Sequence, residues 1–207
     1  MNKRFSIFCI MGIFCISLAY PKTPLKNRFI IGVDGLSSLD SNKQLTGILF
    51  HGGYNLFSKK INFISIEPKI GVGYFEGKKE NKFNSTPISN YKINCISGGL
   101  SPKLNLALNP DENAFIFLEN DFSVMNVQAK INDKGSLSTR TVNENFIFYY
   151  TIKVGLIFQL SKRSGLGLWV GGTTLKFDDL LNKGVPLSKE HYSSEATYYC
   201  IGISLYL

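Results

Sequence analysis

Cysteine is scarce in this chain, and its scarcity excludes the disulfide-rich scaffolds of small secreted proteins. Four cysteines occur among 207 residues, and two of them lie in an apolar run at the N-terminus. Cys95 and Cys200 are the other two, and no CxxC spacing offers a metal site. Either a single bridge joins these two residues or both are buried free thiols.

Charged residues are also few, at 18% of the chain, and they form no segment typical of nucleic-acid binding. The formal net charge is +8, but the lysines are spread over the whole length. No basic stripe alternates with aromatic residues, so no nucleic-acid partner is expected. A solvated excess of charge is the simplest interpretation, and attraction to anionic lipid or polysaccharide is the alternative.

Long apolar runs are absent after the first 19 residues, which excludes transmembrane helices in the rest of the chain. Those first residues have the form of a cleaved signal peptide. Lys3 and Arg4 precede the apolar stretch 5–18, and small residues around Ala19 predict cleavage after it. An uncleaved anchor is the alternative, although the apolar stretch is short for one. Cys15 follows bulky residues, which disfavours a lipoprotein signal.

Apolar and polar residues alternate with a period of two along most of the remaining chain, which predicts an all-β protein. We expect residues 20–26 to form a short segment before a single barrel domain, 27–207. Turn residues divide that domain into eight strands, each longer than is usual for globular proteins. The predicted strands are residues 27–36, 44–57, 62–76, 91–108, 114–129, 145–160, 165–177 and 195–207.

Connections between these strands alternate in length. Residues 58–61, 109–113 and 161–164 are short turns, whereas 77–90, 130–144 and 178–194 are longer polar loops. Transmembrane barrels have short periplasmic turns and longer outer loops. We therefore predict an eight-stranded antiparallel up-and-down transmembrane β-barrel with both termini in the periplasm. A soluble secreted barrel or sandwich is the alternative.

Alternation also predicts which side chains face the interior. The apolar set, such as Phe148, Ile152 and Val154, would contact lipid, and the polar set would line the lumen. Pro68 and Pro102 fall inside two predicted neighbouring strands, where we expect a shared bulge or local gap. Cys95 and Cys200 both face inward on well-separated strands, so a bridge would have to cross the lumen.

The last residues of the chain resemble a known signal. Residues 200–207 are similar to the C-terminal signature of small outer-membrane β-barrels, with Gly202, Leu205 and Leu207 in register. The final residue of the signature is usually Phe, and Leu stands here. The resemblance implies insertion into the outer membrane of a Gram-negative bacterium by the barrel assembly machinery. It implies no single activity, because this family includes adhesins, small porin-like channels, secretion accessories and lipid-modifying enzymes.

Charged side chains at predicted inward positions are the first candidate site. Both signs occur, at Asp34, Glu67, Lys69, Lys103, Glu119, Asp121 and Lys153. Buried charges need partners, so these residues predict an ion-pair network that fills a narrow barrel. A small selective channel lined by the same residues is the alternative.

Two histidines and one tryptophan complete the candidates. His191 and Ser193 resemble the His-x-Ser-Asn motif of lipid A deacylases, with His191 as base and Ser193 as nucleophile, but Ser194 replaces the Asn and no acid follows Glu195. His51 and Trp169 are expected to face inward as a hydrogen-bonded residue and as core packing. We predict no catalytic, cofactor or metal site. The expected role is structural or interactive, as a monomer that contacts membrane lipid and surface or periplasmic proteins.

Overall fold

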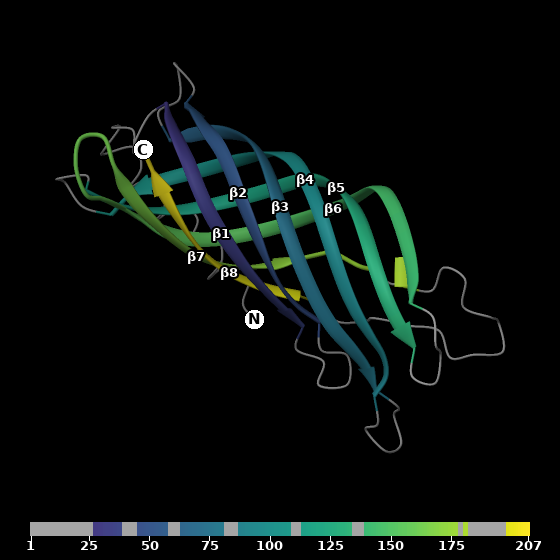
Figure 1. Ribbon diagram of the computed structural model, residues 1–207. Helices are drawn as coiled ribbons and strands as arrows, with labels where there is room; N and C mark the ends of the chain where they lie inside the picture. Colours follow the sequence, from purple (N-terminus) through teal and green to yellow (C-terminus); the bar gives the residue numbers. More distant parts are fainter. Residues whose placement is uncertain are drawn as a thin grey trace, which may run out of the picture.

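A closed antiparallel barrel of eight strands is the architecture of the computed structural model (Figure 1). The structure describes residues 27–38, 45–57, 63–80, 87–108, 113–133, 139–177, 180–181 and 198–207. The strands are β1 (Arg28–Ser38), β2 (Leu45–Phe57), β3 (Ile64–Glu80), β4 (Pro87–Ala107), β5 (Ala114–Asp133), β6 (Arg140–Gln159), β7 (Gly165–Thr173) and β8 (Tyr198–Tyr206). Each strand pairs with the next, and β8 pairs with β1, which confirms the predicted fold class.

Alternating residues of each strand face opposite sides of the barrel wall, as the sequence pattern predicts. On β6, Tyr149, Thr151 and Lys153 are buried inside. Phe148, Ile152 and Val154 lie between them and are exposed on the outer surface. Around the middle of β6 the wall therefore carries polar and charged side chains inside and apolar side chains outside, the reverse of a soluble protein.

Four strands are longer than the sequence pattern predicted. β3 to β6 contain 17 to 21 residues, whereas β7 and β8 contain nine each. Much of the predicted loops 77–90 and 130–144 is therefore strand. The apolar alternation stops there because the outward side chains become polar, but the backbone ladder continues, as the pairs Lys78↔Asn90 and Asn90↔Asn132 show.

The two prolines do not share a gap, which corrects the sequence prediction. The ladder between β3 and β4 runs past both of them without a shift, pairing Ile66 with Pro102 and Pro68 with Leu100. Pro68 instead lies at an interruption of the β2–β3 ladder, and Pro102 at an interruption of the β4–β5 ladder. Proline has no N–H to donate to a ladder, and each proline faces the interrupted ladder on the outer side of the β3–β4 pair. Two separate gaps therefore occur in place of one shared bulge.

The register of the wall shifts at the end of the β3–β4 ladder, between Lys79 and Glu80, and again within the β5–β6 ladder. In the β5–β6 ladder the shift falls between Met125 and Val127, and Phe146 on the facing strand has a φ of 60°. A positive φ is unusual for an aromatic residue. The Asn126 side chain stabilises it by accepting a hydrogen bond from the Phe146 N–H at 3.0 Å.

The connection between β6 and β7 and the C-terminus lie at the same end of the barrel, at the upper left of Figure 1. Reciprocal hydrogen bonds between Phe29 and Leu207 close the wall there. We call this the turn end, and the opposite end, where β3 to β6 project, the loop end. The predicted signal peptide, 1–19, and the segment 20–26 lie outside the described residues. Within the described part of the chain, no helix is apolar and long enough to cross a membrane.

Candidate functional site

All seven charged residues predicted to face inward lie buried in the lumen. They come from five strands, β1 and β3 to β6, and meet in one layer near the middle of the barrel. These residues are Asp34, Glu67, Lys69, Lys103, Glu119, Asp121 and Lys153. We call them the charged layer.

Glu119 on β5 lies at the centre of this layer. One carboxylate oxygen, Oε1, accepts a hydrogen bond from Lys69 Nζ at 3.0 Å, and the other, Oε2, lies 3.0 Å from Lys103 Nζ. Lys153 Nζ lies further away, 3.9 Å from Oε1. A single carboxylate therefore contacts all three lysines.

Each lysine of the charged layer also has a carboxylate of its own. Lys69 Nζ lies 2.7 Å from Asp121, Lys103 Nζ donates to Glu67 at 2.9 Å, and Lys153 Nζ donates to Asp34 at 2.8 Å. Charge-assisted hydrogen bonds of this kind offset the cost of removing ions from water. The predicted ion-pair network is confirmed, and its geometry is that of a filled interior.

His51 and Trp169 both join this layer through Asp34. The Trp169 indole N–H donates to Asp34 Oδ1 at 2.8 Å, and His51 Nδ1 lies 3.6 Å from Asp34 Oδ2. Lys153 Nζ lies 5.1 Å from the centre of the Trp169 ring, within the range of a cation–π contact. Sequence reasoning placed both residues inside, but it assigned Trp169 to packing and missed its hydrogen bond.

Tyr206 also contacts the charged layer, although the sequence pattern did not identify it as a candidate. Lys103 Nζ donates to the Tyr206 hydroxyl at 3.3 Å and lies 5.0 Å from the centre of the Phe117 ring. The alternation along the last strand placed Tyr206 opposite to Leu205 and Leu207, and that signal could have identified it as an inward residue.

Apolar clusters lie above and below the charged layer. At the turn end the cluster contains Ile30, Ala107, Phe115, Phe117, Ile157, Trp169 and Tyr206. At the loop end a larger cluster forms around Leu49, Phe75, Ile93, Met125 and Val127. The charged layer is therefore enclosed by apolar side chains at both ends.

Residues after β7 contribute to the loop-end cluster. Leu175, Phe177, Leu180 and Leu181 are all buried there. The rings of Phe177 and Phe75 pack edge to face, 5.3 Å apart, and Arg140 donates to the Leu181 carbonyl at 3.2 Å. We call residues 174–177 and 180–181 the inward segment. The sequence pattern extended the seventh strand to Phe177, and this is wrong because β7 ends at Thr173.

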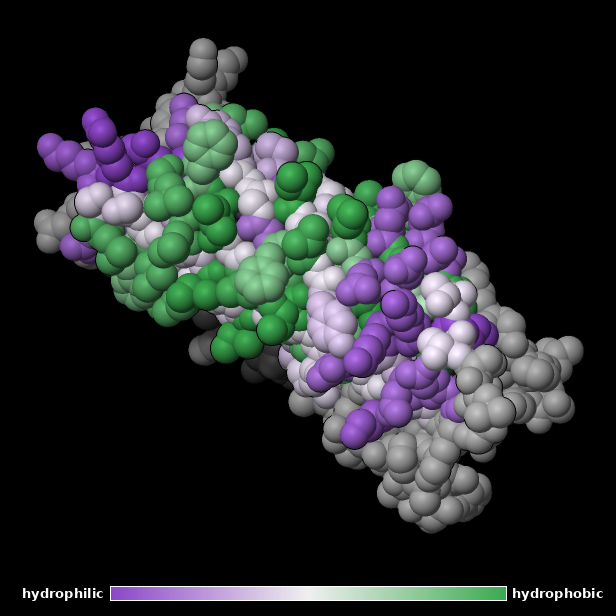
Figure 2. Space-filling model, viewed as in Figure 1, coloured by the Kyte–Doolittle hydropathy of each residue, from purple (hydrophilic) through white to green (hydrophobic). Residues whose placement is uncertain are grey.

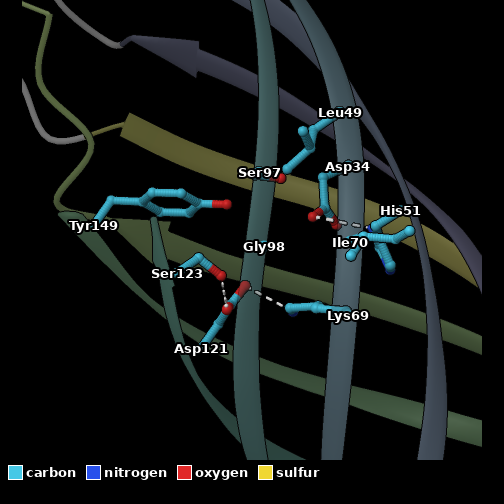
Figure 3. Close-up of a pocket in the computed structure, with 10 residues that line it drawn as sticks. All are labelled: Asp34, Leu49, His51, Lys69, Ile70, Ser97, Gly98, Asp121, Ser123 and Tyr149. Carbon is cyan, nitrogen blue, oxygen red and sulfur yellow. Dashed lines mark hydrogen bonds and ion pairs between the residues drawn. The ribbon is translucent and has the colours of Figure 1, made fainter. Parts of the chain in front are cut away.

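Two small cavities border the charged layer, and each has a volume of about 10 Å³. Figure 3 shows the first of them, where the dashed contacts join Lys69 to Asp121 and His51 to Asp34. A cavity of this size holds about one water molecule. It could not pass a hydrated ion without rearrangement of the surrounding side chains.

The other sequence candidates have simpler positions. Cys95 and Cys200 are buried free thiols, so the alternative of a bridge is wrong. Gly71 and Gly73 leave no space for a side chain, since a Cβ would lie 2.7 Å from the Phe50 carbonyl oxygen and 2.8 Å from Cys95 Sγ. Both glycines therefore relieve crowding inside the narrow barrel. No metal-ligand cluster occurs among the residues that the structure describes, and His191 and Ser193 lie outside them.

Exposed apolar side chains form a continuous belt around the barrel. Figure 2 shows the belt on one face, with hydrophilic surface at both of its ends. Exposed members from all eight strands include Ile31, Phe50, Ile70, Val72, Ile96, Leu100, Phe122, Val124, Ile152, Val154, Leu168, Val170, Ile201 and Ile203. A closed wall with an apolar belt satisfies every requirement for crossing a bilayer with strands. The fold and its surface define a transmembrane β-barrel of the outer-membrane type.

Comparisons with known proteins give structural neighbours of this architecture. No family model matches the chain, and no curated protein matches it. Neisserial surface protein A is 12% identical and aligns over 87% of this chain and 95% of its own, with a TM-score of 0.46. The attachment invasion locus protein Ail of Yersinia pestis is 10% identical, over 87% and 97%, with a TM-score of 0.45. The N-terminal β-barrel domain of Pseudomonas aeruginosa OprF is 9% identical, over 88% and 98%, with a TM-score of 0.42.

Proposed function

We propose that this protein is an outer-membrane barrel that acts through the surfaces it exposes, in a structural or interaction role. The filled interior is the observation that carries the proposal. The charged layer closes the middle of the lumen, and apolar side chains close both of its ends. Binding to partners must then occur on the outside, where β3 to β6 project beyond the belt.

Orientation follows from the lengths of the connections. The turn end would face the periplasm, and the projecting hairpins of the loop end would face outward, as in barrels of known orientation. Gly202, Leu205 and Leu207 of the terminal strand would serve as the signal for the barrel assembly machinery. Wall closure by β1 and β8 leaves the barrel complete as a monomer.

Cell fractionation combined with surface proteolysis tests location and orientation together. The protein should be found in the outer-membrane fraction and should migrate faster in a detergent gel before boiling than after it. Protease added to intact cells should cut within the connections of the loop end and leave the turn end intact. Recovery of the mature protein from the periplasm without detergent would contradict the proposal.

Conductance separates this role from that of a small channel. Purified barrel in planar bilayers should show no steady ionic current, because ions would have to cross the charged layer. The same measurement on Glu119→Gln, which removes the central carboxylate charge, shows whether the charged layer is the barrier to ions. Steady current through the unaltered protein would favour the channel.

A further inference from the structure

Three lysines project from the outer face of the loop end, just beyond the apolar belt. Lys78 is on β3, Lys92 on β4 and Lys130 on β5, and all three side chains are exposed. Figure 2 shows hydrophilic surface over the projecting ends of β3 and β4. We call these residues the lysine triad.

Strand pairing places the members of the triad close together. Lys92 and Lys130 are direct partners in the β4–β5 ladder, and their side chains share the outer face. Lys78 pairs with Asn90, so it is the diagonal neighbour of Lys92. Cβ atoms of direct antiparallel partners are about 5 Å apart, and like charges at that spacing repel. The strand register therefore places three positive charges close together on the outer face of the wall.

One acid, Glu76, lies beside the triad and can offset one of its three positive charges. Glu76 is the direct partner of Lys92, but its carboxylate accepts a hydrogen bond from the Tyr74 hydroxyl at 3.3 Å. No ion pair joins Glu76, or any other acid in the described part of the barrel, to a lysine of the triad. A bound anion would relieve the repulsion between Lys92 and Lys130.

A polar groove provides room for such an anion. Its volume is about 460 Å³, and it is lined by Thr46, Glu76, Gly77, Lys78, Asn90, Tyr91, Lys92 and Asn132. Lys130 does not line the groove and lies beside it, across the ladder from Lys92. Volumes of roughly 300–1,000 Å³ are usual for small-molecule sites. Its hydroxyl, carboxamide and ammonium groups are donors that suit the phosphates and hydroxyls of a sugar, and the Glu76 carboxylate can accept a hydrogen bond from a sugar hydroxyl.

The height of the triad above the belt indicates which kind of molecule could supply a phosphorylated sugar to the groove. Among the β4 residues whose side chains are described, Ile96 is the exposed apolar residue nearest the loop end, and Lys92 lies four residues further out. At about 3.4 Å per residue and a tilt of about 40°, Lys92 lies about 10 Å beyond the hydrocarbon. Ordinary headgroups extend only about 5–8 Å beyond it on each side. A larger, sugar-based headgroup reaches the full height of the groove.

From this geometry we infer that the lysine triad and its groove bind the phosphorylated sugar headgroup of a glycolipid in the outer leaflet. The inference rests on the proposed function, because it needs the loop end to face outward in a membrane. Binding there would hold the projecting hairpins at a fixed angle to the membrane surface. Any larger partner would then meet both the barrel and its bound glycolipid.

Native mass spectrometry of the folded full-length mature protein tests the inference. The probes are rough-type lipopolysaccharide, the same material after enzymatic removal of its phosphates, and phosphatidylglycerol, each added to detergent micelles. The unaltered barrel should retain the phosphorylated glycolipid at about tenfold lower concentration than either other probe, because two charge-assisted contacts favour it.

Matched variants separate the triad from general attraction of a basic protein. Lys92→Gln with Lys130→Gln should weaken retention about tenfold. Lys162→Gln with Arg163→Gln removes the same charge from an exposed turn at the opposite end and should leave retention within about twofold. Equal losses in both variants, or equal retention of phosphatidylglycerol, would overturn the inference.

Folding and orientation are measured on the same variants. Heat-modifiable migration and surface proteolysis should match those of the unaltered protein. If those assays fail for the unaltered protein, the proposed function itself is wrong. If they succeed while the triad variant binds normally, only the glycolipid inference is wrong.

Discussion

Glu119 contacts three lysines, yet we predict that its charge matters less to stability than that of Lys103. Glu119→Gln removes one carboxylate, but each lysine keeps another one within 2.7–2.9 Å. The expected loss in the free energy of unfolding is about 1–3 kcal/mol, the range for a hydrogen bond to a charged group.

Lys103→Met acts differently because it leaves the buried Glu67 carboxylate without a cationic partner among the described residues. Within the described barrel, Lys103 is the one cation that pairs with Glu67, and the Glu67 side chain is almost fully buried. Breaking a buried pair by removing one partner costs about 3–5 kcal/mol. Lys103→Met should therefore destabilise the barrel more than Glu119→Gln does.

A double variant tests the reason for this order. Adding Glu67→Gln to Lys103→Met removes the unpaired carboxylate charge. The double variant should therefore have a free energy of unfolding at least about 2 kcal/mol higher than Lys103→Met alone. Urea unfolding in lipid vesicles, followed by the fluorescence of Trp169, the only tryptophan, measures all three variants. A larger loss for Glu119→Gln than for Lys103→Met, or no recovery in the double variant, would refute this reasoning.

Three further predictions concern packing. Gly202→Ala should lower the free energy of unfolding in urea by about 1–3 kcal/mol, because the new Cβ overlaps the indole of Trp169. The control Gly35→Ala, whose Cβ has no neighbour closer than 3.7 Å, should change it by less than about 0.5 kcal/mol. Equal effects of the two substitutions would contradict the packing around Gly202. Phe177→Ala should lower the unfolding free energy by about 3–5 kcal/mol while the β-type circular dichroism persists, and an unchanged midpoint would show that the inward segment is not packed. Cys95 and Cys200 should resist maleimide in the folded barrel and react fully in denaturant, and labelling of the folded protein would contradict their burial.

The sequence predicts the barrel and the members of the charged layer because both depend on a period of two. A residue such as Lys153 is assigned to the lumen as soon as its neighbours Ile152 and Val154 are assigned to lipid. The pairing of particular charges was not predictable in this way. Lys103 and Tyr206 are 103 positions apart in the chain, and their contact depends on the register of the closed wall.

The ends of the strands were harder to predict, since polar residues in a ladder resemble polar residues in a loop. Lys78 and Asn90 have no apolar alternation around them, yet they pair across β3 and β4. The inward segment was missed for the opposite reason. Leu175 and Phe177 continue the alternation of β7, but they pack inside the loop end instead of extending the wall.

Unequal strand lengths explain why the inward segment exists. β6 continues to Arg140, but its pairing with β7 ends at Thr151↔Thr173, followed by hydrogen bonds between Tyr150 and Thr174. Beyond that point β7 no longer extends the wall. Without other apolar neighbours, Val142 and Ile147 of β6 would be exposed to solvent at the loop end. Both are packed against the cluster that the inward segment completes. The short side of the barrel is thus closed from within, and the long side, β3 to β6, is left as the surface available for binding.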